Sequence, residues 1–187
     1  MPAVDCSLPA PRLARSLLGC RLRLGAVEAE ICETEAYQGT GDRACHAAKG
    51  RTERTAVMFG PPGHLYVYLC YGLHHLLNIV CDAEGVPAAV LVRGLRVLAG
   101  RNKVVARRGR DDGDRLLNGP AKLTQGLGID LALNGRRLGA RTCPLRLLVR
   151  RRQPTSVRAG PRVGVDYAGE PWASMPWRFW VDGFPVA

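Results

Sequence analysis

Apolar residues recur along the first part of the chain at two different spacings, which predict a helix and then strands. From Pro11 to Leu18 the apolar positions have helical spacing, and Gly19 is suited to end the helix. Apolar and polar residues then alternate over Cys20 to Leu24 and Val27 to Thr34, which are separated by Gly25-Ala26. We therefore expect a short amphipathic helix followed by a β-hairpin.

Two strongly apolar runs in the middle of the chain predict a second hairpin. They cover His64 to Gly72 and His75 to Cys81, and the tight connection between them places Tyr71 at the tip. Ala88 to Leu98 is a further strand-like run, interrupted by Arg93. An arginine inside such a run is seldom tolerated without an anionic partner or a wet cleft.

The rest of the chain is predicted to consist of irregular segments, one short helix and short strands. Gln38 to Arg54 is polar and glycine-bearing, and Gly100 to Arg115 is so rich in glycine and charge that we expect a solvated, mobile loop. Asn118-Gly119-Pro120 resembles a helix start, with the helix over Ala121 to Leu127. Short strands are expected at Leu145 to Arg150, Arg162 to Asp166 and Arg178 to Val181.

This succession of elements predicts an α+β fold. Many short strands are joined by few helices long enough for parallel crossovers, so the sheet should be mainly antiparallel. We expect a single mixed domain over residues 1–187, with a curved sheet flanked by short helices and a protruding β-hairpin.

The charge of the chain favours a polyanionic partner. Lys and Arg number 27 against 16 Asp and Glu, which gives a net charge of +11. Cations that neutralise phosphates release condensed counterions and so gain affinity for nucleic acid. The alternative is a basic but uninvolved surface produced by an arginine-rich composition, because net charge speaks only to non-specific association.

Cysteine usage and hydropathy favour a protein of the cytoplasm, nucleoid-associated if the source is bacterial. The seven cysteines are scattered, with no Cys-x-x-Cys pair, so we expect reduced, mostly buried thiols. No apolar run approaches the roughly 18 residues of a membrane helix, and the start of the chain lacks a basic segment followed by a long apolar one. We therefore expect neither a membrane span nor secretion.

Two glutamates lie on the apolar face of an expected strand, where an acidic side chain is unusual. Val27, Ala29 and Ile31 share a face of the expected strand, and the two-residue period puts Glu33 and Glu35 on that same inward face. Burial raises the pKa of a carboxyl group and suits it to take a proton from water. A general acid/base pair and a salt-bridged strand edge both remain open on this spacing.

Aromatic residues gather near these acids. Tyr37, His46, Tyr66 and Tyr68 could wall a flat pocket, although ordinary sheet packing accounts for at least one of the alternating Tyr66 and Tyr68. Tyr71 is harder to explain by packing, because an aromatic at a hairpin tip has no core to fill.

The histidines do not predict a metal centre. His74 and His75 would point to opposite faces of a strand, and no His-x-x-x-His spacing exists. The zinc deaminase pattern and a phosphate-binding glycine loop are both missing from the sequence. We expect no metal and no cofactor.

Several motifs resemble, in the same order, those of the alkyladenine (3-methylpurine) DNA glycosylase family, from about Leu13 to Val181. The residues that resemble the family are Glu33-Thr34-Glu35-Ala36-Tyr37, Ala44-Cys45-His46, Met58-Phe59-Gly60-Pro61-Pro62-Gly63-His64-Leu65-Tyr66-Val67-Tyr68, Tyr71-Gly72, Leu77-Asn78-Ile79, Leu91-Val92-Arg93, Asn118-Gly119-Pro120-Ala121-Lys122-Leu123 and Pro161-Arg162-Val163-Gly164-Val165. The chain departs from the family pattern at Pro171 and Met175.

The resemblance implies a role for each matching residue. Glu35 would activate the water that attacks the deoxyribose C1′ carbon, and Arg93 would position that water and the nucleotide. Asn78 would screen purines by crowding the exocyclic amino group of guanine, and Tyr71 would wedge into the minor groove. The stacking pocket for the extruded base would consist of Tyr37, His46 and Tyr68.

The resemblance thus implies a monofunctional DNA N-glycosylase that starts base excision repair. It would act as a monomer on double-stranded DNA and release alkylated or deaminated purines such as 3-methyladenine, 7-methylguanine, hypoxanthine or ethenoadenine. Lysine, the amine that a strand-cleaving lyase step needs, occurs only at positions 49, 103 and 122. The alternatives are a non-catalytic module that binds damaged DNA and a hydrolase that acts on RNA or nucleosides.

Overall fold

A computed structural model describes residues 4–186 of the chain. Residues 1–3, on which the expectation about the chain's start partly rests, and residue 187 lie outside this range. None of the described helices is long and apolar enough to cross a membrane.

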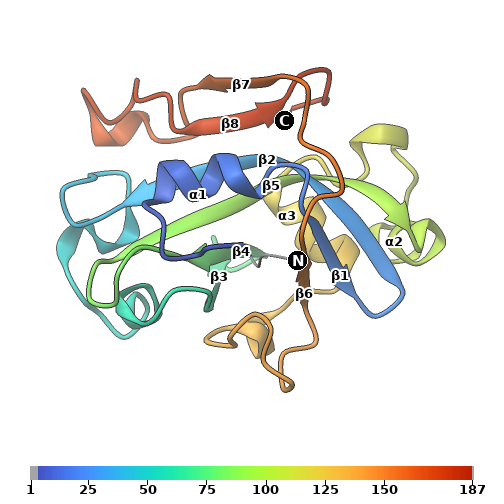
Figure 1. Ribbon diagram of the computed structural model, residues 1–187, viewed down its shortest axis with the longest axis horizontal. Helices are drawn as coiled ribbons and strands as arrows, with labels where there is room; N and C mark the ends of the chain where they lie inside the picture. The colour runs from blue at the N-terminus through green and yellow to red at the C-terminus, as the bar shows by residue number, and fades with distance from the viewer. Residues whose placement is uncertain (1–3, 187) are drawn as a thin grey trace.

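Within the described residues, one eight-stranded sheet organises the fold (Figure 1). The strands are β1 (Arg21–Leu24), β2 (Val27–Gln38), β3 (Leu65–Cys70), β4 (His74–Val80), β5 (Ala88–Ala99), β6 (Arg146–Leu148), β7 (Val157–Gly160) and β8 (Arg178–Val181). They pair in the order β3-β4-β5-β2-β1-β6, while β8 joins β7 to β2. Every pair is antiparallel, and the curved sheet confirms the predicted α+β class.

The strand β2 is the centre of the sheet. It pairs with β5 along most of its length, with β1 over its first four residues, and with β8 from Glu33 to Glu35. Residues 31–36 are all buried, so the expected alternation of inward and outward positions stops there. The register with β5 also shifts on both sides of Glu33. This segment is therefore enclosed on both faces.

Three α-helices cover the sheet. They are α1 (Ala10–Leu17), α2 (Arg101–Arg108) and α3 (Pro120–Leu127). α1 lies against β2, where Thr34 Oγ1 donates a hydrogen bond to the Ala14 carbonyl at 2.9 Å. α3 lies beside β4, where Thr124 Oγ1 donates to the His75 carbonyl at 2.6 Å. The bounds of α1 and α3 confirm the two helices that the sequence predicts.

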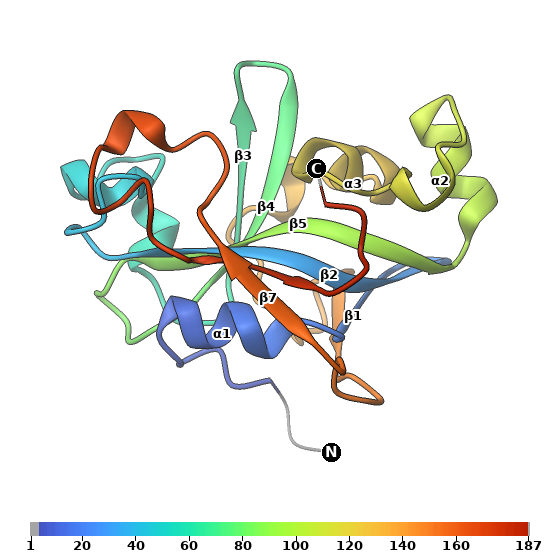
Figure 2. The ribbon, with the colours of Figure 1, turned by 90° about the horizontal axis from the view of Figure 1, so that it is seen from above.

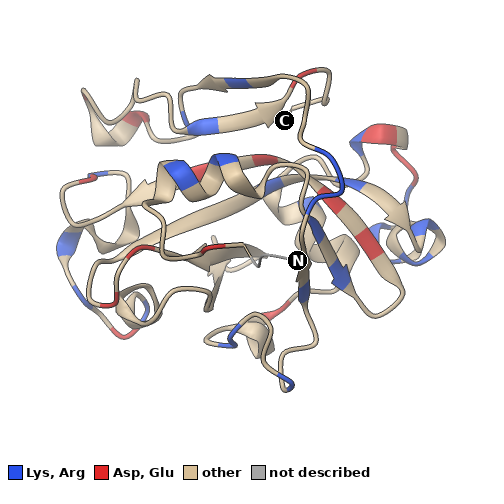
Figure 3. Cartoon of the chain, viewed as in Figure 1, with Lys and Arg blue, Asp and Glu red and all other residues tan. Residues whose placement is uncertain are grey.

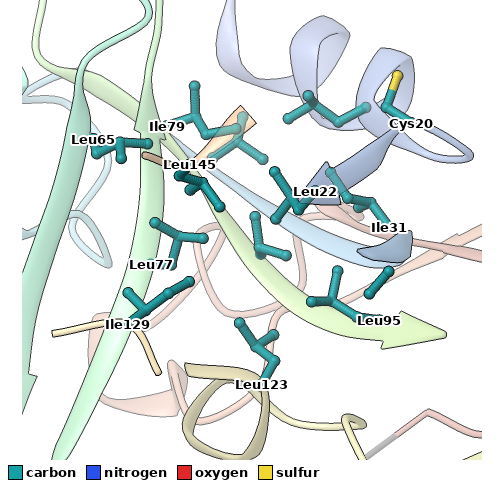
Figure 4. Packing of buried hydrophobic residues seen from close by; sticks show 14 of the residues in the cluster. Cys20, Leu22, Ile31, Leu65, Leu77, Ile79, Leu95, Leu123, Ile129 and Leu145 are labelled. Carbon is teal, nitrogen blue, oxygen red and sulfur yellow. The ribbon is translucent and has the colours of Figure 1, made fainter. Parts of the chain in front are cut away.

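The main hydrophobic core fills the space between the sheet and these helices (Figure 4). Leu77 and Ile79 of β4 meet Leu22 of β1 and Ile31 of β2 there, and all four side chains are fully buried. Burial of such side chains is the dominant favourable contribution to folding. The base of the β3–β4 hairpin is thus anchored in the core.

The outer part of the β3–β4 hairpin projects away from the sheet (Figure 2). Its turn is closed by the Leu73 amide, which donates to the Cys70 carbonyl at 3.0 Å. Tyr71 and Gly72, the central residues, have φ values of 50° and 69°. Two positive φ angles define a type I′ turn, which suits glycine but strains a bulky residue. Tyr71 is 92% exposed, so packing does not explain this strain.

Two expectations from the sequence are wrong. Gly100 to Arg115 is not one solvated loop, because it contains α2, whose buried Val104 packs against α3. The strand expected over Arg162 to Asp166 lies earlier, at β7, and ends before Pro161. Gly164 has a φ of 71°, and Asp166 begins a 3-10 turn. The contacts of this segment with Asp42 and Glu35 take the place of strand pairing.

Charges are distributed over the whole fold. Lys and Arg positions occur on helices, strands and loops alike rather than in one block of the chain (Figure 3).

All seven cysteines lie in the described part of the chain and are free thiols, as the sequence predicts. Burial raises the pKa of Cys45 to about 11, so this neighbour of His46 is a neutral thiol.

Packing of α2 on α3 gives a first prediction. A Cβ atom added at Gly126 would clash with Leu117 Cδ2 and lie 2.9 Å from Val104 Cγ1. Gly126→Ala should lower the free energy of unfolding by about 1–3 kcal/mol, measured with urea, because overpacking outweighs the gain in helix propensity. Gly41→Ala is the matched control, since its Cβ meets no atom within 4 Å. Equal stability of the two variants would contradict the packing of α2.

Candidate active site

Two buried carboxylates share one guanidinium group at the centre of β2. Glu33 and Glu35 have no exposed surface, and Arg93 of β5 is 6% exposed. Arg93 Nε lies 3.1 Å from Glu33 Oε1 and 3.4 Å from Glu35 Oε1. The two acids therefore share a face, as predicted, and Arg93 has the anionic partner that its position in an apolar strand required.

A second arginine completes the set of charges around Glu33. Arg178 Nε of β8 lies 3.4 Å from Glu33 Oε1. Burial raises the pKa of Glu33, and the positive charges of Arg93 and Arg178 oppose that rise. Glu33 Oε2 is buried and has no hydrogen-bond partner among residues 4–186. Two acids and two arginines thus balance one another inside the protein.

Glu35 is held by donors from three directions. Its Oε1 accepts a hydrogen bond from the Val163 amide at 2.7 Å, in addition to its ion pair with Arg93. Its Oε2 accepts from the Tyr37 hydroxyl at 2.8 Å. Hydrogen bonds from fixed donors set the orientation of a carboxylate. The carboxylate is therefore preorganised, and one of its donors, Tyr37, also lines the neighbouring cavity.

That cavity has a volume of about 260 Å³ and opens beside the β3–β4 hairpin. Most of the site residues predicted from the sequence line it. These are Tyr37, His46, Tyr68, Tyr71, Asn78 and Arg93. Glu35 is not part of the lining, but two of its partners, Tyr37 and Arg93, are.

The wall formed by β3 is a stack of rings. Tyr66 and Tyr68 stack with their centroids 5.3 Å apart, and His46 meets Tyr68 edge-on at 4.7 Å. His46 Nδ1 lies 3.0 Å from the Tyr66 hydroxyl. The role of Tyr66 is therefore not limited to packing within the sheet, since its hydroxyl orients the imidazole of His46. Burial, aided by the charge of Arg54, lowers the pKa of His46 to about 4, which keeps the ring neutral.

The opposite side is fixed by a buried ion pair. Arg162 donates to both carboxylate oxygens of Asp42, and the Arg162 guanidinium lies 4.8 Å from the centroid of the Tyr37 ring. Neither side chain of the pair has any exposed surface. Breaking a buried pair costs about 3–5 kcal/mol, so this contact holds the Arg162 segment firmly against Tyr37. It also delivers the Val163 amide to Glu35.

Asn78 and Tyr71 differ in how they are supported. Asn78 is 4% exposed, and its Nδ2 donates to the Tyr66 carbonyl on the opposite strand at 3.0 Å. Tyr71 stands at the rim, on the exposed hairpin tip. Sequence reasoning missed Val163 and Tyr167, which also line the cavity: the pattern assigns Val163 to a strand over Arg162 to Asp166 and gives Tyr167 no role. The only available signal was the family-like motif that contains Val163.

The site can receive a flat, largely apolar group beside a buried carboxylate. Within residues 4–186, no three His, Cys, Asp or Glu side chains are grouped so as to hold a metal ion. The sequence model of the methylpurine-DNA glycosylase family matches residues 5–185, which include this whole site. The chain belongs to the methylpurine-DNA glycosylase family.

Individual relatives agree with this assignment. An Arabidopsis thaliana protein named DNA-3-methyladenine glycosylase is 45% identical over 99% of this chain and 72% of its own length. A Myxococcus xanthus protein is 46% identical over 97% of this chain and 89% of its own, and one from Rhodopseudomonas palustris is 45% identical over 91% and 81%. Both bacterial proteins are named as 3-methyladenine DNA glycosylases, and both names mark the activity as provisional.

Family membership makes the chain an enzyme that hydrolyses N-glycosidic bonds in DNA. A module that only binds damaged DNA, one of the alternatives left open by the sequence, is thereby set aside. The methylpurine-DNA glycosylase family also accounts for the basic composition, because its substrate is a polyanion.

The environment of His46 predicts a pH-dependent stability. The pKa of His46 is about 4 in the folded protein against an ordinary value of 6.5, so between these pH values the unfolded chain binds more protons. The free energy of unfolding should therefore fall as the pH is lowered from 6.5 to about 4. Urea unfolding across this range should show a weaker dependence for His46→Gln, and the imidazole NMR signal of His46 should titrate near pH 4. A midpoint near 6.5 would contradict the burial described here.

Proposed function

We propose that this glycosylase extrudes alkylated or deaminated purines from duplex DNA, binds them in the aromatic cavity and hydrolyses their N-glycosidic bond. The observation that supports this most strongly is the position of the cavity. It lies between the buried Glu35–Arg93 ion pair and the exposed Tyr71 at the hairpin tip. Enzymes that act on a base must take it out of the stack, which costs a few kcal/mol.

In this proposal the extruded base stacks in the cavity. Tyr37 forms one wall, and Tyr68 with His46 forms another. Aromatic faces attract cationic alkylpurines and stack on neutral ones. Asn78 screens the base by crowding an exocyclic amino group, and its fixed amide supports this role because a steric filter needs a rigid side chain.

Glu35 acts as the general base. It takes a proton from water as the water oxygen bonds to C1′, while the electron pair of the C1′–N bond leaves with the purine. Arg93 positions the water and the nucleotide, and its guanidinium forms an ion pair with the carboxylate. The buried surroundings strengthen each of these electrostatic interactions.

Tyr71 acts as the wedge. Projecting from the hairpin, it enters the minor groove and fills the gap that the extruded nucleotide leaves. Its positive φ supports the role, because strain in an exposed residue is more often retained for function than for packing.

The enzyme acts as a monomer and leaves an intact abasic site. None of its three lysines lines the cavity, which argues against a Schiff-base step through lysine.

The decisive experiment measures base release. Duplex oligonucleotides with one 3-methyladenine, 7-methylguanine, hypoxanthine or ethenoadenine should lose that base, and Glu35→Gln should slow release by about 10²–10⁴-fold without loss of DNA binding. Glu53→Gln, which changes an exposed acid, is the matched control and should remain active. Activity of Glu35→Gln, release only from RNA or nucleosides, or strand nicking without alkali would each count against the proposal.

The wedge has its own test. In the Glu35→Gln background, Tyr71→Ala should shorten the lifetime of the complex with a 7-methylguanine duplex by about 5–100-fold, the range expected for loss of one aromatic stack. Tyr71→Phe keeps the ring and should retain the lifetime. Because both replacements have the same backbone requirement as tyrosine, stability should not separate them. Equal lifetimes for alanine and phenylalanine would remove Tyr71 from this role.

A further inference from the structure

Each tyrosine wall of the cavity has an arginine guanidinium over its ring. Arg162 Cζ lies 4.8 Å from the Tyr37 centroid, and Arg54 Cζ lies 4.9 Å from the Tyr68 centroid. Neither arginine lines the cavity itself. The two walls therefore share one feature, a guanidinium group 4.8–4.9 Å from the ring centroid.

The two arginines differ in how their charge is balanced. Arg162 is buried and paired with Asp42, so its charge is neutralised locally. Arg54 is exposed and takes part in none of the ion pairs formed by residues 4–186. The Tyr68 side of the cavity thus carries one uncompensated positive charge, whereas the Tyr37 side carries none.

This charge reaches the other groups of the same wall. After burial, the positive charge of Arg54 is the second cause that lowers the pKa of His46. It also opposes the rise that burial causes in the pKa of Tyr66 and of Tyr68. Glu35 of β2 also acts on Tyr68, with the opposite sign and more weakly than Arg54. Among the Arg, Lys, Asp and Glu side chains, Arg54 therefore has the strongest influence on this wall, and that influence is positive.

A positive charge at this wall distinguishes two classes of purine lesion. A 7-methylguanine base is cationic, so the guanidinium repels it and weakens the attraction of the tyrosine faces. Hypoxanthine is neutral. When its C1′–N bond breaks and the electron pair moves to the base nitrogen, negative charge develops on the leaving base, and a nearby cation stabilises it. The same arginine thus opposes one class and assists the other.

We propose that Arg54 is a specificity-determining residue that favours release of neutral, deaminated purines over cationic alkylpurines. This inference rests on the proposed function, because it requires the base to enter the cavity beside Tyr68. It adds the class of lesion that this wall favours and a residue outside the cavity lining that sets it.

The test compares hypoxanthine with 7-methylguanine in otherwise identical duplexes under single-turnover conditions. Arg54→Gln should lower the ratio of the hypoxanthine rate to the 7-methylguanine rate by about three-fold, the order expected for one solvent-screened charge near the base. Arg54→Lys keeps the positive charge and should retain most of the ratio. Arg51→Gln is the matched control, because it removes the same charge from the same loop and Arg51 makes none of the cation–π contacts of the described residues.

Three results would overturn the inference. The first is an unchanged ratio in Arg54→Gln, including the case in which both rates fall equally because Arg54 only braces the loop. The second is an equal change in Arg51→Gln, which would mean that net charge alone is responsible. The third is a wild-type protein that releases 7-methylguanine but no hypoxanthine. Release of neither base by the wild type would instead refute the proposed function, from which this inference follows.

Discussion

The rest of the structure depends on the pairing of Glu33 and Glu35 with Arg93. Carboxylates deep inside a protein are stable only when cations and hydrogen bonds compensate the loss of water. β5 supplies Arg93 and β8 supplies Arg178, so β2 is satisfied only when both neighbours pair with it in the observed register. The charges that surround Glu35 therefore also align the three strands around it.

A second buried pair extends this arrangement to the cavity. Asp42 and Arg162 are far apart in the chain, and their contact brings the segment after β7 against Tyr37. This segment then donates the Val163 amide to Glu35. The cavity is thus closed by electrostatic contacts on one side and by the stacked rings of the β3–β4 hairpin on the other. The hairpin itself is anchored by its buried base, which leaves its tip free to project.

Local sequence patterns account for most of the elements. The spacing of apolar residues predicted α1, both hairpins and β5, because each buries one continuous apolar face or run, although β2 extends four residues beyond the predicted end at Thr34. It failed for α2, whose charged surface hides a single buried contact through Val104. It failed again at Arg162 and Val163, which were predicted to lie in a strand. In the structure Arg162 forms an ion pair with Asp42, and the Val163 amide donates a hydrogen bond to Glu35. Isolated tertiary contacts leave no periodic signal.

The sequence by itself determined the type of fold, the inward position of Glu33 and Glu35, the aromatic tip at Tyr71 and, through ordered motifs, the family. Periodicity and motif order are local or linear properties, so one chain suffices to read them. Only the tertiary structure decided that the acids share Arg93, that Val163 and Tyr37 hold Glu35, and that Arg54 lies over the Tyr68 ring. These facts depend on distances between segments that are remote in sequence, and packing of the whole chain sets those distances.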